Sequence, residues 1–243
     1  MVDIYITSFF RQQMTERTIS LLQERTTPGT YQLHVFDNGS DKSTQDYLYS
    51  LLENKTIASL HLDSRNTGCL YNKAIFHAMT ASTQPYYVIT DNDIYPPKLS
   101  PDWLQQMTAI MEMYPGLACL TPQCATSAMH TMPELIHPTV VFCKVAGNAL
   151  KLMRRAAFPV NQYHQKLNAF GDDGQLSELI RNNGWHIGFC RQVFFLHAGQ
   201  CENWGYEANE IDNDPRKATY GPPLIVPVIN EETWEPADPK YKL

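Results

Sequence analysis

Residues 86–97 read YYVITDNDIYPP, in which an apolar stretch typical of a buried strand leads into Asp91-Asn92-Asp93 and then two prolines. Side chains alternate along an extended segment, so Asp91 and Asp93 are expected to point the same way and Asn92 the other way. Two neighbouring carboxylates repel each other unless a cation lies between them. The stretch therefore indicates a clip for Mg²⁺ or Mn²⁺ that also holds a diphosphate, or else an ordinary solvated turn, which is the commoner origin of such a tripeptide.

Strand and helix patterns alternate before this stretch. Strands are predicted at 3–7, 32–40, 57–62 and 86–90, and helices at 15–25, 43–54 and 68–81. Ser43 and Asp46 resemble a capping box at the start of the second helix. Such alternation predicts a parallel sheet with helices on both faces. Ligands bind such sheets at the carboxyl ends of the strands, so Ser8, Asp37, Asn66 and Asp91 should share one edge.

The second half of the chain is less regular. A helix is predicted at 100–116, capped by Ser100, with Pro101 at its first position. Strands are predicted at 117–122, 139–144 and 194–199, and a helix at 172–184 that stops at Gly184. We expect a single domain over residues 1–215, with halves at 1–98 and 99–215. Residues 216–243, rich in Pro, Asp and Glu, are expected to form an extended tail that is at best partly ordered.

Composition narrows the class of protein. The chain has 243 residues, a formal charge of −6, 43% hydrophobic residues and 18% charged residues, as in a globular α/β protein of one large or two small domains. The acidic balance argues against nucleic-acid binding. We expect neither a transmembrane segment nor a signal peptide. The six cysteines form no CxxC pair, which favours free thiols in a reducing cytosol, and Cys119 and Cys124 lack the second pair that a zinc site needs.

Two motifs accompany the acidic pair at the predicted sheet edge. Asp37 in DNGSD can accept a hydrogen bond from a nucleobase N–H, although such a sequence is most often a tight turn. Asn66 and Gly68 in NTGCLYN lie at a strand-to-helix junction, where the helix N-terminus can face an anion or a ribose, or where Asn66 merely caps the helix.

Two further groups could carry chemistry. Asp172 and Asp173 precede a helix in GDDGQLSELIRNNGW, where acids are normally favourable caps but where a carboxylate can also act as a general base toward a hydroxyl. His197 ends an apolar strand. Such a histidine is usually structural, yet its imidazole can also complete a metal shell begun by Asp93.

Taken in order, TSFFR, DNGSD, NTGCLYN, DND and GDDGQLSELIRNNGW resemble the pattern of family 2 glycosyltransferases with a GT-A fold, over about residues 3–200. The resemblance implies an α/β fold with a Rossmann-like, mostly parallel central sheet flanked by helices, and with a mixed half on the acceptor side. It also implies a nucleoside-diphosphate-sugar donor bound across the first half of the sheet, and a divalent metal, Mn²⁺ or Mg²⁺.

The same resemblance implies roles for single residues. The residues expected to bind the donor are Ser8, Phe9, Arg11, Asp37, Asn66, Gly68, Asn72 and Asp91. Asp93 is expected to hold the metal on the diphosphate, with Asp91 and His197 as further ligands. In inverting members an Asp of this kind is the catalytic base, which assigns that role to Asp173 with Asp172 as its partner. Because Gly174-Gln175 departs from the family pattern, Asp172 remains an alternative base.

The acceptor side is less defined. Residues 122–170 should shape a site for a hydroxyl of a glycan or lipid-linked acceptor. Trp204 and Tyr206 can stack on a sugar or pack against the core, and Arg154 and Arg155 can meet anionic groups or form a solvated surface pair. Because no membrane segment is expected, we expect the protein in the cytosol, and the resemblance implies a place at the inner membrane surface if the acceptor is lipid-linked.

The sequence argues against three other functions. A sugar-phosphate nucleotidyltransferase should carry a glycine-rich, arginine-containing loop after its first strand, and TSFFRQQ has no glycine. A catalytically silent nucleotide- or sugar-binding protein is expected to lose one of the two acidic sites, and this chain keeps both. A phosphatase of the haloacid dehalogenase type carries its DxD near the first strand, whereas here the motif follows the fourth predicted strand.

Overall fold

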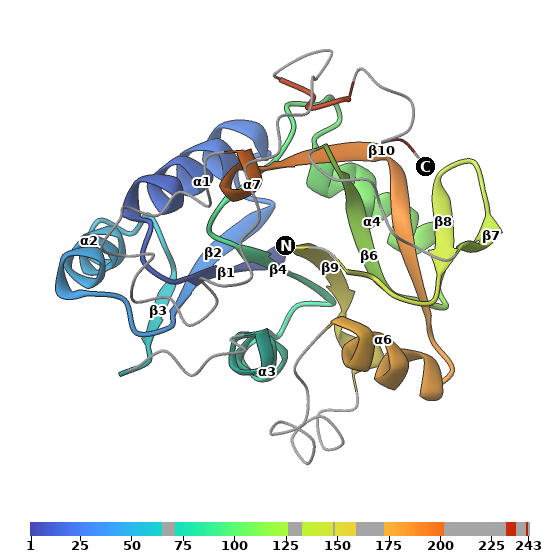
Figure 1. The fold of residues 1–243 in the computed structure, drawn as a ribbon, viewed down its shortest axis with the longest axis horizontal. Helices are drawn as coiled ribbons and strands as arrows, with labels where there is room; N and C mark the ends of the chain where they lie inside the picture. The colour runs from blue at the N-terminus through green and yellow to red at the C-terminus, as the bar shows by residue number, and fades with distance from the viewer. Residues whose placement is uncertain are drawn as a thin grey trace.

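The computed structural model describes residues 1–64, 71–125, 133–147, 149–158, 173–201, 232–236 and 242. Its centre is a mixed sheet with the strand order β3-β2-β1-β4-β9-β6-β10-β8-β7, and β5 pairs with β10 beside it (Figure 1). The strands are β1 (Val2–Ser8), β2 (Tyr31–Asp37), β3 (Ser59–Leu62), β4 (Tyr86–Asp91), β5 (Ile94–Tyr95), β6 (Leu117–Cys124), β7 (Pro133–Ile136), β8 (Val140–Cys143), β9 (Leu150–Arg154) and β10 (His186–His197).

The two halves of the sheet differ in strand direction. β1 pairs in parallel with β2 and β4, and β2 in parallel with β3. From β9 onward the sheet is mixed, because β9 runs antiparallel to β4 and β6 whereas β10 runs parallel to β6. The predicted fold class, a mostly parallel Rossmann-like sheet with a mixed second half, is confirmed. The central strand β9 was not predicted, because Lys151 and Arg154 interrupt its apolar sequence and look like surface residues. In the structure Lys151 is buried.

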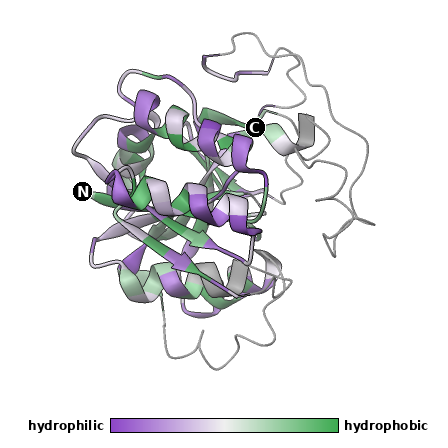
Figure 2. Ribbon diagram, turned by 90° about the vertical axis from the view of Figure 1, so that its left-hand side faces the viewer, coloured by the Kyte–Doolittle hydropathy of each residue, from purple (hydrophilic) through white to green (hydrophobic). Residues whose placement is uncertain are grey.

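Helices cover both faces of the sheet, as predicted (Figure 1). They are α1 (Gln12–Arg25), α2 (Lys42–Glu53), α3 (Tyr71–Ala81), α4 (Trp103–Met113), α6 (Asp173–Asn182) and α7 (Ala198–Cys201), with a 3₁₀ turn at Arg155–Ala157. Residues of α1, α2 and α4 share one buried cluster, and residues of α3 and α6 share the cluster on the other face. Hydrophilic and hydrophobic residues alternate along the helices, which is the pattern of elements with one face in the core (Figure 2).

Two helix starts differ from the predictions. The α2 helix is capped by Asp41, whose carboxylate accepts a hydrogen bond from Thr44 N at 2.9 Å, and Asp46 instead pairs with Lys42 on the surface. The α4 helix is capped by Asp102 rather than Ser100, through Gln105 N at 2.8 Å. In both cases a carboxylate in extended backbone satisfies a free N–H of the first turn.

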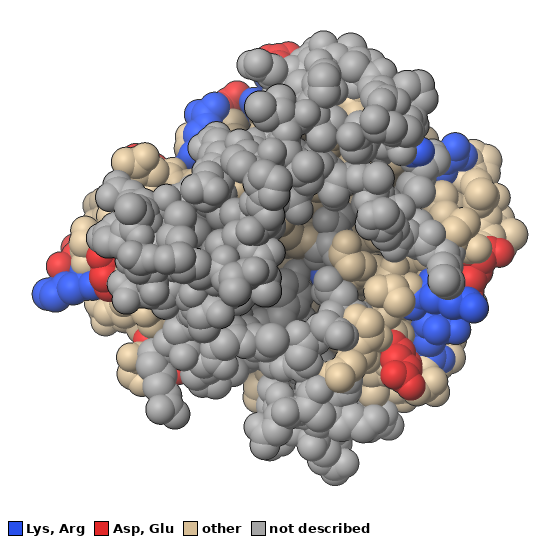
Figure 3. Space-filling view, viewed as in Figure 1, with Lys and Arg blue, Asp and Glu red and all other residues tan. Residues whose placement is uncertain are grey.

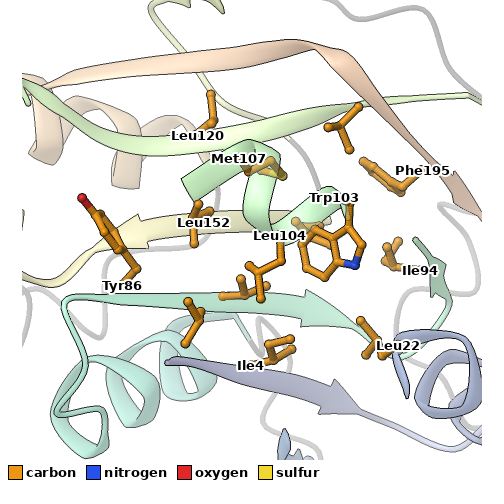
Figure 4. Close-up of a cluster of buried hydrophobic side chains, with 14 of the residues drawn as sticks. Ile4, Leu22, Tyr86, Ile94, Trp103, Leu104, Met107, Leu120, Leu152 and Phe195 are labelled. Atoms are coloured by element: carbon orange, nitrogen blue, oxygen red, sulfur yellow. The ribbon is translucent and has the colours of Figure 1, made fainter. Parts of the chain in front are cut away.

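The core between α4 and the sheet is built around Trp103 (Figure 4). Its indole lies near Leu22, Ile94 and Phe195, which come from α1, β5 and β10, and its Nε1 donates to Thr26 Oγ1 at 2.9 Å. This packing fixes α1 and β5 relative to each other. Arg11 directly precedes α1, and Asp93 directly precedes β5.

Arg154 is half-buried and bonded within the protein, so it is not part of a solvated surface pair. Its Nε donates to Leu117 O at 2.9 Å and its guanidinium lies 5.1 Å from the centre of the Tyr86 ring. Arg154 pairs with Tyr86 at the beginning of β4, whereas Asp91 ends that strand. It is therefore remote from the carboxyl edge of the sheet. Arg155, the next residue, is exposed.

Within the described residues, Cys119, Cys124, Cys143 and Cys190 are thiols that form no disulfide, as predicted for them. No helix in these same ranges has the length and apolar character needed to cross a membrane. Part of the predicted tail, residues 232–236, lies against the rest of the molecule: Lys98 N donates to Glu232 O at 2.7 Å, and Trp234 Nε1 donates to Pro96 O at 3.1 Å.

Candidate nucleotide and metal site

The carboxyl ends of the parallel strands bring three of the predicted residues together. Ser8 pairs with Asp37 at the ends of β1 and β2, and Thr7 pairs with Asp91 at the end of β4. Ser8 and Asp37 are fully buried. The predicted shared edge is therefore present for these residues. Asn66 and Gly68 lie outside the described residues.

Asp93 is fixed by the pairing of β5 with β10. Ile94 pairs with His197, and Ala198 N donates to Asp93 O at 2.8 Å. This backbone pairing carries His197 to the acidic pair, with its Nε2 at 3.2 Å from Asp93 Oδ2. Arg11 Nη1 donates to the same Oδ2 at 2.6 Å. Asp93 is buried and has two basic partners on one oxygen.

The loop between β1 and α1 aims Arg11 at this carboxylate. Phe10 and Arg11 have φ values of 51° and 55°, in the left-handed region, which costs a non-glycine residue roughly 1 to 2 kcal/mol. Phe10 N donates to Ser40 Oγ at 2.8 Å, and Phe10 O accepts from Asn92 Nδ2 at 3.1 Å. These bonds hold a conformation that the loop sequence alone does not favour.

Asn92 is the polar centre of the turn, and its side chain reaches the same Arg11 guanidinium that bonds Asp93. The alternation expected of an extended segment, with Asn92 opposite Asp93, therefore does not hold in this turn. Its Nδ2 donates to Thr15 Oγ1 at 2.8 Å, its Oδ1 accepts from Arg11 Nη2 at 2.5 Å, and its backbone O accepts from Thr18 Oγ1 at 2.8 Å. The buried threonines of α1 were not predicted as site residues. Their signal in the sequence is weak: two polar residues three positions apart on the otherwise apolar face of a helix.

The electrostatics separate the two carboxylates. Burial, and next the charge of Asp93, raise the pKa of Asp91 to about 6. Burial would also raise the pKa of Asp93, but Arg11 and then His197 hold that pKa well below its usual range. Burial lowers the pKa of His197, but its ion pair with Asp93 outweighs burial and raises it. Asp93 is thus a permanent anion, while Asp91 is the member of the pair that can change charge near neutrality.

Asp37 bonds to its own loop. Its carboxylate accepts from Ser40 N at 3.0 Å, from Ser40 Oγ and from Gln45 Nε2 at 3.4 Å. Burial raises the pKa of Asp37 above its usual value in spite of these bonds. Gly39, with φ of 78°, allows the turn. Phe9 is also buried, with its ring against Phe10.

Gly199 closes the site behind Asp93. A Cβ at this position would lie 2.3 Å from Asp93 Oδ2 and 3.2 Å from Arg11 Nη1. The first contact is closer than a carbon atom tolerates, and the second is tight. The first turn of α7 therefore packs directly on the ion pair, and only a glycine fits there.

The described residues offer a divalent cation one unpartnered carboxylate oxygen rather than a full set of ligands. Among the described residues, no group of three His, Cys, Asp or Glu side chains converges closely enough to hold a metal ion, so Asp91, Asp93 and His197 do not form the complete shell that was expected. Within the same ranges, however, Asp93 Oδ1 is buried without a hydrogen-bond partner, as are Thr7 Oγ1 and Ser8 Oγ. A hard carboxylate oxygen left open suits Mg²⁺ or Mn²⁺ when substrate phosphates supply most of the other ligands.

The remaining predicted residues divide into two groups. Asn72 lies in the first turn of α3, and Asp173 begins α6; both helices cover the same face of the sheet. Asp172, Trp204 and Tyr206 lie outside the described residues. Two cavities of about 430 and 570 Å³ open near the beginnings of β2 and β4, at Tyr31 and at Pro85, away from the acidic pair.

On the face shown in Figure 3, the visible Lys, Arg, Asp and Glu side chains of the described residues lie around the rim, with both signs mixed. The charges that define the candidate site are those of Arg11, Asp91, Asp93 and His197, three of which are buried or nearly so.

Solved structures share this fold. The crystal structure of GalNAc-T7 with UDP, GalNAc and Mn²⁺ matches with a TM-score of 0.62 at 13% identity, over 81% of this chain and 43% of that chain. The crystal structure of residues 1–349 of S. aureus TarS matches with a TM-score of 0.59 at 14% identity, over 88% of this chain and 66% of that chain. At these identities the likeness establishes the fold.

Sequence comparison gives the family. No curated protein sequence matches the chain. The model of the family described as glycosyl transferase family 2 matches residues 3–166, which include β1, Asp37 and the Asp91-Asn92-Asp93 turn. By that match the chain belongs to glycosyltransferase family 2.

Proposed function

We propose that this protein is a divalent-metal-dependent, inverting glycosyltransferase that moves a sugar from a nucleoside-diphosphate-sugar donor to a hydroxyl of a glycan or lipid-linked acceptor. The observation that carries the proposal is Asp93, a buried carboxylate at the carboxyl edge of the sheet with one oxygen open. Family membership and the structural likeness to a protein crystallised with UDP and Mn²⁺ support it.

In this proposal the first half of the sheet binds the donor. Ser8, Phe9, Asp37 and the residues around Asn66 border the nucleoside. Asp93 Oδ1 and Asp91 face the diphosphate, where a bound Mg²⁺ or Mn²⁺ would offset the charge that develops on the departing nucleoside diphosphate. Arg11 and His197 fix Asp93 through its other oxygen. The Asp93 carboxylate therefore does not have to reorganise when the donor arrives.

Acceptor activation is assigned to the start of α6. Asp173 would take the proton of an acceptor hydroxyl, whose oxygen attacks the anomeric carbon opposite the leaving group. One such displacement inverts the configuration. Asp172 is the alternative base. The lipid-linked form of the proposal places the protein at the inner membrane surface, which flotation with acceptor-loaded vesicles would test.

Calorimetry with UDP, GDP and dTDP, each with and without Mn²⁺, tests the donor site. At least one nucleotide should bind, and more tightly with Mn²⁺. Asp93→Asn should remove the Mn²⁺ effect, whereas Asp46→Asn, the same change on an exposed helix residue, should not. Failure of every nucleotide to bind would exclude the donor site. Binding without transfer to any acceptor would favour the silent binding protein.

Transfer assays test the base. Asp173→Asn should reduce kcat by at least about 100-fold, the range for loss of a general base, and should leave donor affinity nearly unchanged. The matched variant Asp172→Asn should retain most activity. An active Asp173→Asn together with an inactive Asp172→Asn would move the role to Asp172. Pyrophosphate release from a nucleoside triphosphate and a sugar phosphate would instead identify a nucleotidyltransferase.

A further inference from the structure

Asp93 Oδ2 is closed to any ligand from outside. It accepts from Arg11 Nη1 at 2.6 Å and lies 3.2 Å from His197 Nε2. Its remaining side is covered by Gly199, where even a Cβ would stand only 2.3 Å away. Of the two oxygens only Oδ1 lacks a hydrogen-bond partner, so a cation taken up by Asp93 would be held through Oδ1 alone while Arg11 is in place.

Arg11 is not a loosely attached surface cation. Its side chain is 8% exposed, and its second terminal nitrogen donates to Asn92 Oδ1 at 2.5 Å. Asn92 is in turn bonded to Thr15 and Phe10. A planar guanidinium that bridges two buried side chains in this way is held in one orientation. Its charge is thus a fixed property of the site.

This charge changes what the acidic pair can bind. Without Arg11, the carboxylates of Asp91 and Asp93 would face a cation with His197 as their remaining basic neighbour, and the guanidinium adds a fixed positive charge beside Asp93. A divalent ion at Oδ1 would also lie within a few ångströms of the guanidinium, where like charges repel strongly in a buried site. A nucleoside diphosphate brings negative charge and phosphate oxygens of its own, and the attraction of the cation to them outweighs its repulsion by the guanidinium.

We propose, on the basis of the function proposed above, that Arg11 is a positioning residue that serves as the internal counter-ion of Asp93 and prevents the free protein from holding a divalent cation. Cation binding then depends on the nucleoside diphosphate, which must arrive first or together with the ion. Arg11 acts on the donor site through Asp93, in addition to any direct contact with the donor.

Calorimetry with Mn²⁺ alone tests this inference without any turnover. Arg11→Gln should bind Mn²⁺ at least about tenfold more tightly than the wild-type protein, because one nearby positive charge is removed. Arg11→Lys, which keeps the charge, should remain as weak as wild type. Arg17→Gln removes the same charge from an exposed position on α1 and should also have no effect.

A second substitution locates the gained affinity. Adding Asp93→Asn to Arg11→Gln should abolish the tighter Mn²⁺ binding, because the open carboxylate oxygen is lost. Tighter binding that survives this change would place the ion elsewhere and overturn the inference. So would a folded Arg11→Gln protein that binds Mn²⁺ no better than wild type.

A measurement on the wild-type protein guards against misfolding of Arg11→Gln. In protein labelled with ¹⁵N-arginine, the Arg11 side-chain signal, assigned by its loss in Arg11→Lys, should be unchanged by Mg²⁺ alone and should shift on addition of Mg²⁺ with UDP, GDP or dTDP. A shift with Mg²⁺ alone would overturn the inference. If no nucleotide binds under any condition, the proposed function fails, while the Mn²⁺ affinities of the Arg11 variants still decide the role of Arg11.

Discussion

Asp93 has two oxygens with opposite surroundings. Oδ2 is bonded to Arg11 and lies beside His197, whereas Oδ1 is buried without a hydrogen-bond partner. A buried carboxylate is stable only when its charge is compensated, and removing the partner of such a pair typically costs about 3 to 5 kcal/mol. The stability of this turn and its capacity to bind a ligand therefore reside in different atoms of one side chain.

Gly199→Ala should damage the site at this scale. The added carbon would overlap Asp93 Oδ2 and crowd Arg11 Nη1, so we expect a loss of about 1 to 3 kcal/mol in the free energy of unfolding and weaker binding of nucleotide with Mn²⁺. Urea unfolding and calorimetry measure the two effects.

Gly29→Ala is the control. A side chain there strains the backbone, because φ is 79°, but nothing lies near its Cβ. This variant should lose stability but keep its ligand affinity. Equal ligand affinity in both variants would contradict the close packing of Gly199.

At the scale of elements, the face of the sheet near α3 holds a cluster of histidine and aromatic rings. His34 of β2 stacks on Tyr5 of β1 at 4.6 Å between ring centres, and His61 of β3 lies 4.9 Å from His77 of α3. Asp3 Oδ1 lies 3.5 Å from His34 Nε2 and is the acidic neighbour of this cluster. Burial lowers the pKa of both His34 and His77, and for His77 the other two histidines lower it further.

These shifts predict a loss of stability in acid. A histidine whose pKa is lower in the folded state takes up its proton first in the unfolded state, so stability is complete above about pH 6.5, the unfolded pKa, and falls as the pH drops through the folded pKa. Urea unfolding between pH 7.5 and pH 5 should show this decline. In His77→Phe the proton uptake on unfolding should be smaller by up to about one proton.

Phe36→Leu is the matched control for that experiment. Phe36 stacks on His61 with 4.7 Å between ring centres and carries no titratable proton. This variant should lower stability by a similar amount at every pH and leave the slope unchanged. An unchanged slope in His77→Phe would show that His77 does not contribute to the acid sensitivity.

At the scale of the whole molecule, residues 232–236 join the end of α1 to the segment after β5. Arg25 lies 5.2 Å above the Trp234 ring and also donates to Glu232 O at 3.3 Å. Trp234 packs against a small cluster of Met14, Leu21, Tyr95 and Ala198, the last of which binds Asp93 O. This part of the predicted tail therefore supports the elements that carry the candidate site.

Trp234→Ala should lower the free energy of unfolding by about 2 kcal/mol, since a large half-buried ring and its hydrogen bond are lost. Trp234→Phe should restore most of the packing. Lys98→Gln, which removes only an exposed ion pair with Glu232, should cost no more than about 0.5 kcal/mol. Urea unfolding measures all three. A Trp234→Ala protein as stable as Lys98→Gln would show that the segment is only loosely attached.

The sequence by itself determined the parallel half of the fold and the edge at which the polar residues meet. Alternating strand and helix patterns are local signals, and the ends of parallel strands fall at one edge, so Ser8, Asp37 and Asp91 could be placed together without a structure. Alternation alone placed Asn92 opposite the aspartates, whereas in the turn its side chain bonds the same guanidinium as Asp93. The helix caps failed because an acid and a serine stand close together before both α2 and α4, and the sequence does not choose between them.

Only the tertiary structure decided which residues complete the acidic pair. Arg11 and Asp93 are 82 positions apart, and their contact depends on two left-handed residues, on Asn92 and on the pairing of β5 with β10. Lys151 and Arg154 look like surface residues in the sequence, yet they belong to a strand in the middle of the sheet. The physical reason is the same in each case: a charge can be buried wherever the fold supplies its partner, and that partner comes from a distant segment that no local pattern identifies.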